Sequence, residues 1–128
     1  MKILTVEDNE INAKLMDYIL NDLTFDFTNT IATSAKEALN FTSQDRFNLI
    51  LMDINLGSGQ MDGSEVMSIL KDKDDYQEVP MYAITCYTLD KDRIRFLEAG
   101  FDRYFTKPIN HSELLRAISE DQVRQLGS

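Results

Sequence analysis

Short apolar segments alternate with longer amphipathic segments from one end of the chain to the other. The apolar segments have the length and composition of strands that are buried on both faces of a parallel sheet. They predict five strands, at about residues 3–6, 25–28, 49–52, 81–84 and 102–105. The second is the least apolar, because Phe25 and Phe27 alternate with polar residues, so we expect that strand at an edge of the sheet.

Each predicted strand is followed by a helical pattern. Apolar residues recur every three or four positions over residues 10–22, as on one face of an amphipathic helix. Ser34 and Glu37 have the spacing of a capping box, which begins the second helix. Further helices are expected from about Gly63, over residues 89–98 and from Asn110. This alternation predicts an α/β fold, a doubly wound five-stranded parallel sheet with five helices on its two faces.

The composition is that of one globular domain. The chain has 128 residues, of which 43% are hydrophobic and 27% are charged. We place the domain at residues 1–122 and expect residues 123–128 to form a frayed tail. The apolar runs fall short of the ~20 residues that cross a bilayer, so we expect no membrane insertion. The N-terminus has no signal-peptide pattern and the single cysteine forms no internal disulfide, which favours a cytoplasmic protein.

The chain is acidic, with a formal net charge of −9. Phosphate backbones require Lys and Arg, so direct binding to nucleic acid is not expected. The negative charge would attract cations or basic protein surfaces, but solubility alone explains an acidic surface equally well.

Polar residues occur at the carboxyl ends of four of the predicted strands. Glu7 and Asp8 follow the first strand, and Asp53 follows the third. Thr85 ends the fourth strand and Lys107 follows the fifth. In an open α/β sheet, ligands bind at this edge, where the strand order reverses. We therefore expect these five side chains to lie close together.

Three carboxylates at one place repel one another, and a hard divalent cation such as Mg²⁺ relieves the repulsion. With the cation in place, Asp53 could act as a nucleophile toward phosphorus and form an aspartyl phosphate. Lys107 and the hydroxyl of Thr85 would then contact the phosphoryl oxygens.

Four stretches of the sequence carry a family resemblance, and they are Val6–Asn9, Leu51–Ile54, Ala83–Thr85 and Phe105–Pro108. In order and spacing they resemble the receiver domains of two-component response regulators, over about residues 1–120. Glu7-Asp8-Asn9 looks most like receivers that are associated with hybrid histidine kinases. The resemblance implies a flavodoxin-like, CheY-like sheet with the strand order 2-1-3-4-5.

The resemblance also implies a role for each site residue. Asp53 matches the phospho-acceptor, Asp8 a direct Mg²⁺ ligand, and Glu7 an acidic position that acts through a metal-bound water. Asn55 matches the position that offers its backbone carbonyl to the metal. Lys107 matches a phosphate-contacting residue that commonly precedes a cis proline.

Two residues match the switch of the family. Thr85 corresponds to the residue that moves toward the phosphoryl group, and Tyr104 to the aromatic that turns inward in response. The phosphoryl donor would be a histidine kinase or a histidine phosphotransfer domain. Phosphorylation would alter the surface of helix 4, strand 5 and helix 5, which signals to a downstream protein. Such a domain is a phospho-acceptor rather than an enzyme, and it acts as a monomer or as a phosphorylation-dependent dimer.

The chain departs from the family pattern in the segment Leu56–Gly63, which is longer than usual and contains no proline. Its glycines predict greater mobility.

Three other functions fit the same scaffold less well. A constitutive binding module would be expected to lack one or more of Asp8, Asp53, Thr85 and Lys107, and all four are present. A flavodoxin-like FMN protein needs a neutral phosphate loop after the first strand, where this chain has Glu7-Asp8-Asn9-Glu10. An aspartyl-phosphate hydrolase would have a second acidic residue at position 55, where this chain has asparagine, and a cap domain.

Overall fold

The computed structural model describes residues 1–56, 61–86 and 89–127. Its centre is a five-stranded sheet in which every neighbouring pair of strands is parallel. The strands are β1 (Lys2–Val6), β2 (Thr28–Ala32), β3 (Leu49–Asp53), β4 (Met81–Thr85) and β5 (Arg103–Thr106). Their order is β2-β1-β3-β4-β5, which confirms the predicted fold and places β2 and β5 at the edges.

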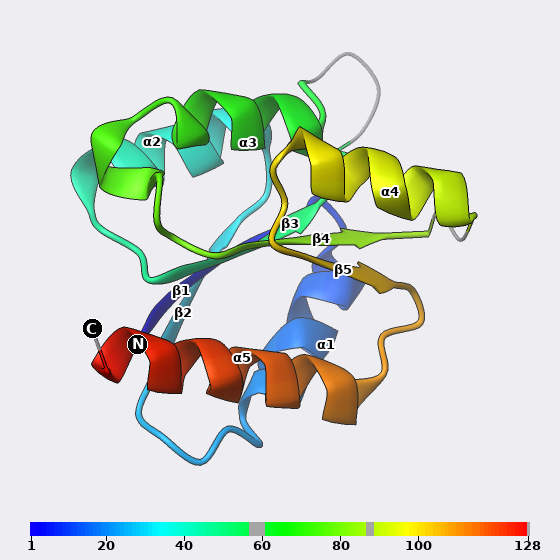
Figure 1. Cartoon of the computed structure of the whole chain (residues 1–128). Coiled ribbons are helices and arrows are strands. Elements are labelled where there is room, and N and C mark those ends of the chain that lie inside the picture. Colours follow the sequence, from blue (N-terminus) through cyan, green and yellow to red (C-terminus); the bar gives the residue numbers. More distant parts are fainter. Residues whose placement is uncertain (57–60, 87–88, 128) are drawn as a thin grey trace.

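Five α-helices of the described residues cover both faces of this sheet. They are α1 (Glu10–Leu20), α2 (Ala35–Gln44), α3 (Gly63–Lys71), α4 (Asp90–Ala99) and α5 (His111–Leu126). Helices α2, α3 and α4 lie on one face, and α1 and α5 lie on the other (Figure 1). A short 3₁₀ helix, Asp74–Tyr76, lies within the polar segment that connects α3 to β4.

The second strand lies later in the chain than the sequence pattern predicted. Thr28–Ala32 pairs with β1, whereas Phe25 and Phe27 precede the strand. Both phenylalanines are half-buried and pack against the core under α1 and α5. The alternation of Phe25 and Phe27 with polar residues therefore reflects packing of the connecting segment. The strand itself carries few large apolar side chains, because it is an edge strand.

The helix boundaries follow from local capping. Side chains of Asn9, Ser34, Asp62 and Asn110 each accept a hydrogen bond from the backbone amide three residues later. Helix α4 ends at Gly100, whose φ of 128° is accessible to glycine at little cost.

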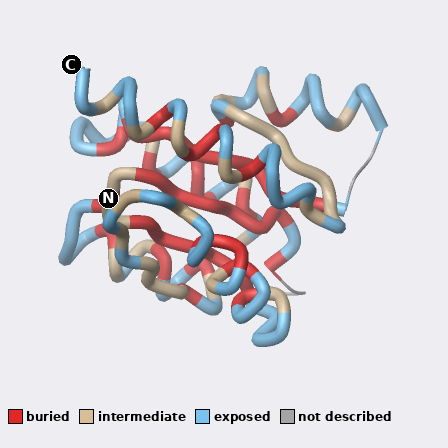
Figure 2. Tube along the Cα trace, turned by 90° about the horizontal axis from the view of Figure 1, so that it is seen from below, coloured by how far each residue is buried: buried red, intermediate tan, exposed pale blue. Residues whose placement is uncertain are grey.

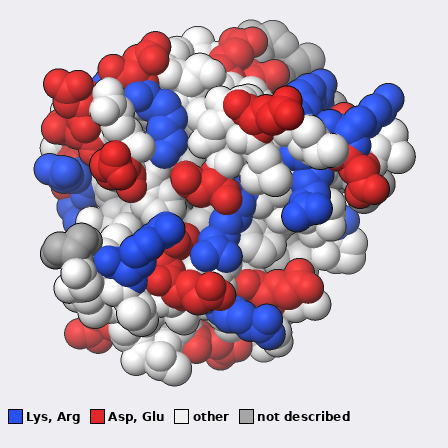
Figure 3. Space-filling model, viewed as in Figure 1, with Lys and Arg blue, Asp and Glu red and all other residues white. Residues whose placement is uncertain are grey.

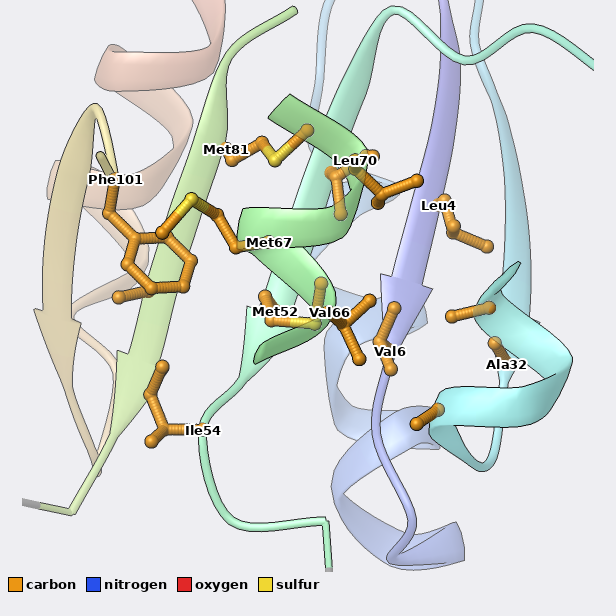
Figure 4. Close-up of a cluster of buried hydrophobic side chains, with 14 of the residues drawn as sticks. Leu4, Val6, Ala32, Met52, Ile54, Val66, Met67, Leu70, Met81 and Phe101 are labelled. Atoms are coloured by element: carbon orange, nitrogen blue, oxygen red, sulfur yellow. The ribbon is translucent and has the colours of Figure 1, made fainter. Parts of the chain in front are cut away.

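The core has two parts, one on each face of the sheet. Alternate residues along β1, β3 and β4 point to opposite faces, so Leu4, Met52 and Met81 pack under α2, α3 and α4. Figure 4 shows these side chains meeting Val66, Met67 and Leu70 of α3. On the other face, the core residues of the strands are Ile3, Leu49, Leu51, Tyr82 and Ile84, and they pack against α1 and α5. The three central strands, β1, β3 and β4, are the most buried part of the described chain, and the outer faces of the helices are exposed (Figure 2).

Helix α5 continues to Leu126, into the stretch 123–128 for which the sequence predicted a frayed tail. The side chain of Gln125 donates a hydrogen bond to the backbone carbonyl of Asn48, at 2.8 Å. The helix is therefore attached to the segment before β3 close to its end. The domain boundary at residue 122 stays a prediction.

Candidate functional site

The alternation of side chains along the strands gathers the candidate residues at the carboxyl end of the sheet. In β3, Leu51 faces α1 and α5, so Asp53, two residues later, faces the same side. Phe105 and Lys107 are related in the same way along and just beyond β5. Glu7, which follows β1, joins them, and all three polar side chains line one cleft.

Lys107 forms ion pairs with both buried carboxylates. Its Nζ lies 3.0 Å from Oε1 of Glu7 and 3.5 Å from Oδ2 of Asp53. Glu7 is 6% exposed and Asp53 is 5% exposed. Buried carboxylates are costly unless they are paired, so Lys107 offsets part of the repulsion between these two groups. The sequence pattern had indicated Lys107 as a phosphate ligand but had not indicated its pairing with Glu7.

The protonation of the site is set by this burial and pairing. Burial is the main reason that the pKa of Glu7 is raised to about 6, and the neighbouring Asp53 raises it further, against the opposing effect of Lys107. For Lys107, burial acts to lower the pKa, but pairing with Glu7 and Asp53 outweighs it, so the pKa is raised. Lys107 is therefore positively charged at neutral pH, while Glu7 changes protonation in mildly acidic solution.

Three carboxylates meet at the mouth of the cleft. Glu7, Asp8 and Asp53 each place an oxygen atom within 4.8 Å of the others, with Asp8 exposed to solvent. Carboxylate oxygens are the ligands that hard divalent cations prefer, and one lysine cannot neutralise three carboxylates. The donor set therefore fits a divalent cation. The structure brings these residues together as the sequence indicated, and their individual roles as ligands stay predictions.

Asn55 stands beside this cluster. Its backbone amide donates to Oδ1 of Asp53 at 3.2 Å, which fixes the orientation of that carboxylate. Its side-chain amide lies 3.7 Å from Sγ of the exposed Cys86, so the segments after β3 and β4 are in contact at this point. The role of the Asn55 carbonyl as a metal ligand stays a prediction.

Thr85 and Tyr104, the two expected switch residues, belong to the opposite face of the sheet. Met81 and Ala83 pack under α3 and α4, and Thr85, which ends the same strand, is fully buried on that side. Tyr104 is half-buried against the same core and stacks on Phe96 of α4, with ring centroids 6.0 Å apart. The side chains of Thr85 and Tyr104 therefore point to the face of the sheet opposite the cleft, although Thr85 and Asp53 both end their strands at the same edge.

Backbone hydrogen bonds join the strand ends that carry Asp53 and Lys107 to the end of β4, which carries Thr85. Asp53 is in register with Ile84, and the amide of Ile54 donates to the carbonyl of Ile84 at 3.1 Å. The amide of Lys107 donates to the carbonyl of Thr85 at 2.8 Å. The peptide bond between Lys107 and Pro108 is cis, as the resemblance suggested.

Gly63 is a site residue whose importance the sequence pattern did not show. A Cβ atom built on Gly63 would lie 2.4 Å from the carbonyl oxygen of Asp53 and 2.8 Å from Cγ of Met52. The first turn of α3 therefore approaches β3 at the position of Asp53, and any side chain would displace one of them. The glycine next to Asp62 was the available signal, but it predicted only the start of a helix. The longer segment Leu56–Gly63 lies partly outside the described residues, because 57–60 are not among them.

The charges on the surface are mixed. Acidic and basic side chains alternate over the face seen in Figure 3, and no continuous basic area is seen on it. Among the described residues, no helix is long and apolar enough to cross a membrane.

Comparison with known proteins identifies the class to which this fold and site belong. The model of the response regulator receiver domain family matches residues 3–119, so the chain belongs to that family. It is accordingly a receiver domain of two-component signalling, a phospho-acceptor rather than an enzyme with a separate substrate.

Two curated proteins show how the chain relates to the family. The polar-differentiation response regulator DivK of Brucella anthropi is 34% identical over 117 residues, which are 91% of each chain. The hybrid signal transduction histidine kinase I of Dictyostelium discoideum is 35% identical over 123 residues, covering 92% of this chain and 7% of that protein. The same domain therefore occurs both alone and within a much larger kinase.

Solved structures agree with the fold. The receiver domain of the sensor histidine kinase PA1611 from Pseudomonas aeruginosa, with a magnesium ion coordinated in its active site cleft, is 30% identical. The TM-score is 0.81, and the match covers 99% of this chain and 98% of that one. The manganese-bound form of the response regulator Rcp1 is also 30% identical, with a TM-score of 0.76 and coverage of 91% and 88%.

Proposed function

We propose that Asp53 accepts a phosphoryl group from a phosphohistidine and that this modification switches the surface formed by α4, β5 and α5. The observation that carries the proposal is the meeting of Glu7, Asp8 and Asp53 within 4.8 Å, with Lys107 as the counter-charge. A carboxylate cluster of this kind is poised to bind a cation and then a phosphate.

The donor set fits Mg²⁺. Asp8 and Asp53 would be direct ligands together with the backbone carbonyl of Asn55, and Glu7 would act through a bound water. When bound, the ion shields the incoming phosphoryl group from the carboxylates and neutralises charge in the transition state.

The chain's own residues account for the rest of the reaction. An oxygen of Asp53 attacks phosphorus, a phosphorus–oxygen bond forms, and the bond from phosphorus to the imidazole nitrogen of the donor breaks. The electron pair of that bond leaves with the imidazole. Lys107 exchanges its contact with Glu7 for a phosphoryl oxygen, which lies in reach because Nζ is already 3.5 Å from Asp53. Most of the catalysis is positioning and charge neutralisation.

The switch would act through the other face of the sheet. Thr85 turns toward the phosphoryl group at the end of β4, and Tyr104 occupies the space that Thr85 leaves. Tyr104 stacks on Phe96, which is the buried residue of α4, and the N-terminus of that helix has no side-chain cap at Leu89. A helix that buries a single side chain shifts between two positions at lower cost than one with a broad buried face.

The family implies a histidine kinase as the phosphoryl donor, and a histidine phosphotransfer domain would be the alternative donor. The output would be contact with a downstream protein in the cytoplasm, made by a monomer or by a phosphorylation-dependent dimer. Direct contact with nucleic acid is disfavoured by the net charge of −9.

The decisive experiment is intact-mass spectrometry after incubation with acetyl phosphate, with and without Mg²⁺. The protein should gain the mass of one phosphoryl group only when Mg²⁺ is present, and Asp53→Asn should gain none. Glu78→Gln, an exposed change remote from the site, should behave as wild type. Modification of Asp53→Asn to the same extent as wild type would overturn the assignment of Asp53.

A further inference from the structure

The cleft that contains Asp53 extends well beyond the carboxylates. It has a volume of about 380 Å³ and runs between α1 and the segment that follows β5. Helices α1 and α5 flank the same face of the sheet (Figure 1). Beyond the polar end, the lining is apolar, with Leu15 and Met16 on α1, Leu51 and Ile84 on the sheet, and Pro108 and Ile109 after β5.

The cleft has the form of a small-molecule site. Such sites typically measure about 300–1,000 Å³ and combine apolar walls with a few convergent polar groups. Here the charged groups are Glu7, Asp53 and Lys107, which contact one another, and Thr5 and Asn12 add two uncharged polar side chains to the lining. At the other end, Leu15 is 45% exposed and Pro108 is also exposed, so the apolar part opens to solvent.

The charge at the polar end selects the ligand. Glu7 and Asp53 contribute two carboxylates and Lys107 one ammonium group, and the exposed Asp8 adds a third carboxylate nearby. Without a bound metal ion the balance is negative, so a cation is attracted and a carboxylate is repelled. A primary ammonium group also supplies three hydrogen-bond donors to carboxylate oxygens that act only as acceptors.

We propose that this cleft binds a small amphiphilic primary amine, with the ammonium head against Glu7 and Asp53 and the apolar body between α1 and Ile109. The inference rests on the proposed function only in sharing the carboxylates assigned to Mg²⁺. Amine and Mg²⁺ therefore compete, and each raises the apparent dissociation constant of the other. An amine of this class holds the domain in a state that cannot accept a phosphoryl group.

The probe is octylamine, titrated into the full chain in Mg²⁺-free buffer and followed by NMR shifts of Lys107 and of the methyl groups of Leu15 and Ile109. We expect a dissociation constant on the order of 1 mM. Ethylamine, which has the ammonium group but lacks the long alkyl chain, should bind at least about tenfold more weakly. Octanoate, which has the same body and the opposite charge, should also bind more weakly. Equal or tighter binding of octanoate overturns the proposal, and so does the absence of octylamine binding at about 10 mM.

Two matched variants of α1 test the apolar wall. Leu15→Asn changes a residue that lines the cleft, and Ile11→Asn changes a residue one turn earlier that is 77% exposed and lies outside the lining. Leu15→Asn should weaken octylamine binding by about tenfold. Ile11→Asn should leave it unchanged, and equal effects of the two variants overturn the proposed position of the body.

Competition with Mg²⁺ completes the test. Adding Mg²⁺ should displace octylamine from wild type, and simultaneous binding without mutual weakening overturns the shared site. These titrations use unphosphorylated protein, so they succeed or fail independently of acetyl phosphate. Failure of phosphorylation alone would contradict the proposed function while leaving the amine site in place.

Discussion

Glu7 is a nearly buried carboxyl group beside a second buried carboxyl, and this position links its protonation to folding. Its pKa is raised from the ordinary value of 4.5 to about 6 by burial and by Asp53. The folded protein therefore holds this proton more tightly than the unfolded chain. The stabilisation is complete below about pH 4.5 and is lost as the pH rises through about 6.

Replacing Glu7 with glutamine should remove this pH dependence. In Mg²⁺-free buffer, the unfolding free energy of wild type should fall by up to about 2 kcal/mol relative to Glu7→Gln between pH 4.5 and pH 7. Urea unfolding at a series of pH values measures the difference. Glu78→Gln, on the exposed surface, should follow wild type, and a parallel pH profile for Glu7→Gln would contradict the coupling.

Gly63 keeps α3 in contact with the end of β3. In Gly63→Ala, the new methyl group would lie 2.4 Å from the carbonyl oxygen of Asp53, which is backbone and cannot move aside as a flexible side chain would. We expect a loss of about 1–3 kcal/mol in unfolding free energy and slower phosphorylation by acetyl phosphate. Ser68→Ala, on the exposed face of the same helix, is the control. Wild-type rates in Gly63→Ala would show that the displacement does not reach Asp53.

At the scale of elements, a buried polar network joins β4 and β5 to α5. The hydroxyl of Tyr82 donates to Asp121, whose side chain is 1% exposed. Nε of Arg103 lies 3.3 Å from the same carboxylate, and Arg124 contacts its other oxygen. Removing one member of such a network leaves a buried charge with fewer partners, which costs more than an ordinary surface hydrogen bond.

Tyr82→Phe should therefore destabilise the protein by about 1–3 kcal/mol while leaving the packing of the ring intact. Chemical denaturation provides the measurement. Tyr18→Phe removes the same hydroxyl from a residue that is 68% exposed, and it should change stability little. If the two substitutions had equal effects, the network would contribute nothing specific to the attachment of α5.

The elements also show which sequence signals are reliable. Leu49–Asp53 is buried at every position, so an uninterrupted apolar run identified the central strand. The edge strand Thr28–Ala32 lacks such a run, and the neighbouring Phe25 and Phe27 gave a stronger but misleading pattern. Helix starts were found more reliably, because Ser34 and Asn110 make their capping contacts with residues three positions away in the chain.

At the scale of the whole molecule, the sequence predicted which residues meet but not how they pair. Parallel topology alone places Glu7, Asp53 and Lys107 at one edge of the sheet. The ion pair between Lys107 and Glu7 joins residues 100 positions apart and depends on the twist and packing of the folded sheet. The contact between Gly63 and Asp53 likewise depends on how closely α3 packs, which no local pattern records.

The proposed switch involves the whole molecule, and it can be tested through Tyr104. Beryllofluoride with Mg²⁺ should mimic the phosphoryl group and shift the NMR signals of the Tyr104 ring, while those of the exposed Tyr18 stay unchanged. In Thr85→Ala the Tyr104 shift should be lost although the ligand still binds. Thr85→Ser, which keeps the hydroxyl, should retain it, and an undiminished shift in Thr85→Ala would place the switch elsewhere.

The position of β5 at the edge of the sheet determines what a partner can sense there. Helix α4 lies on one face and α5 on the other, and β5 is the border at which both layers reach the surface together. A partner protein that bound α4 and α5 together across this border would respond to the position of one layer relative to the other rather than to the shape of either. A displacement of α4 that is too small to change the shape of any single helix would then still change the position of α4 relative to α5, and a partner that contacts both helices would detect it.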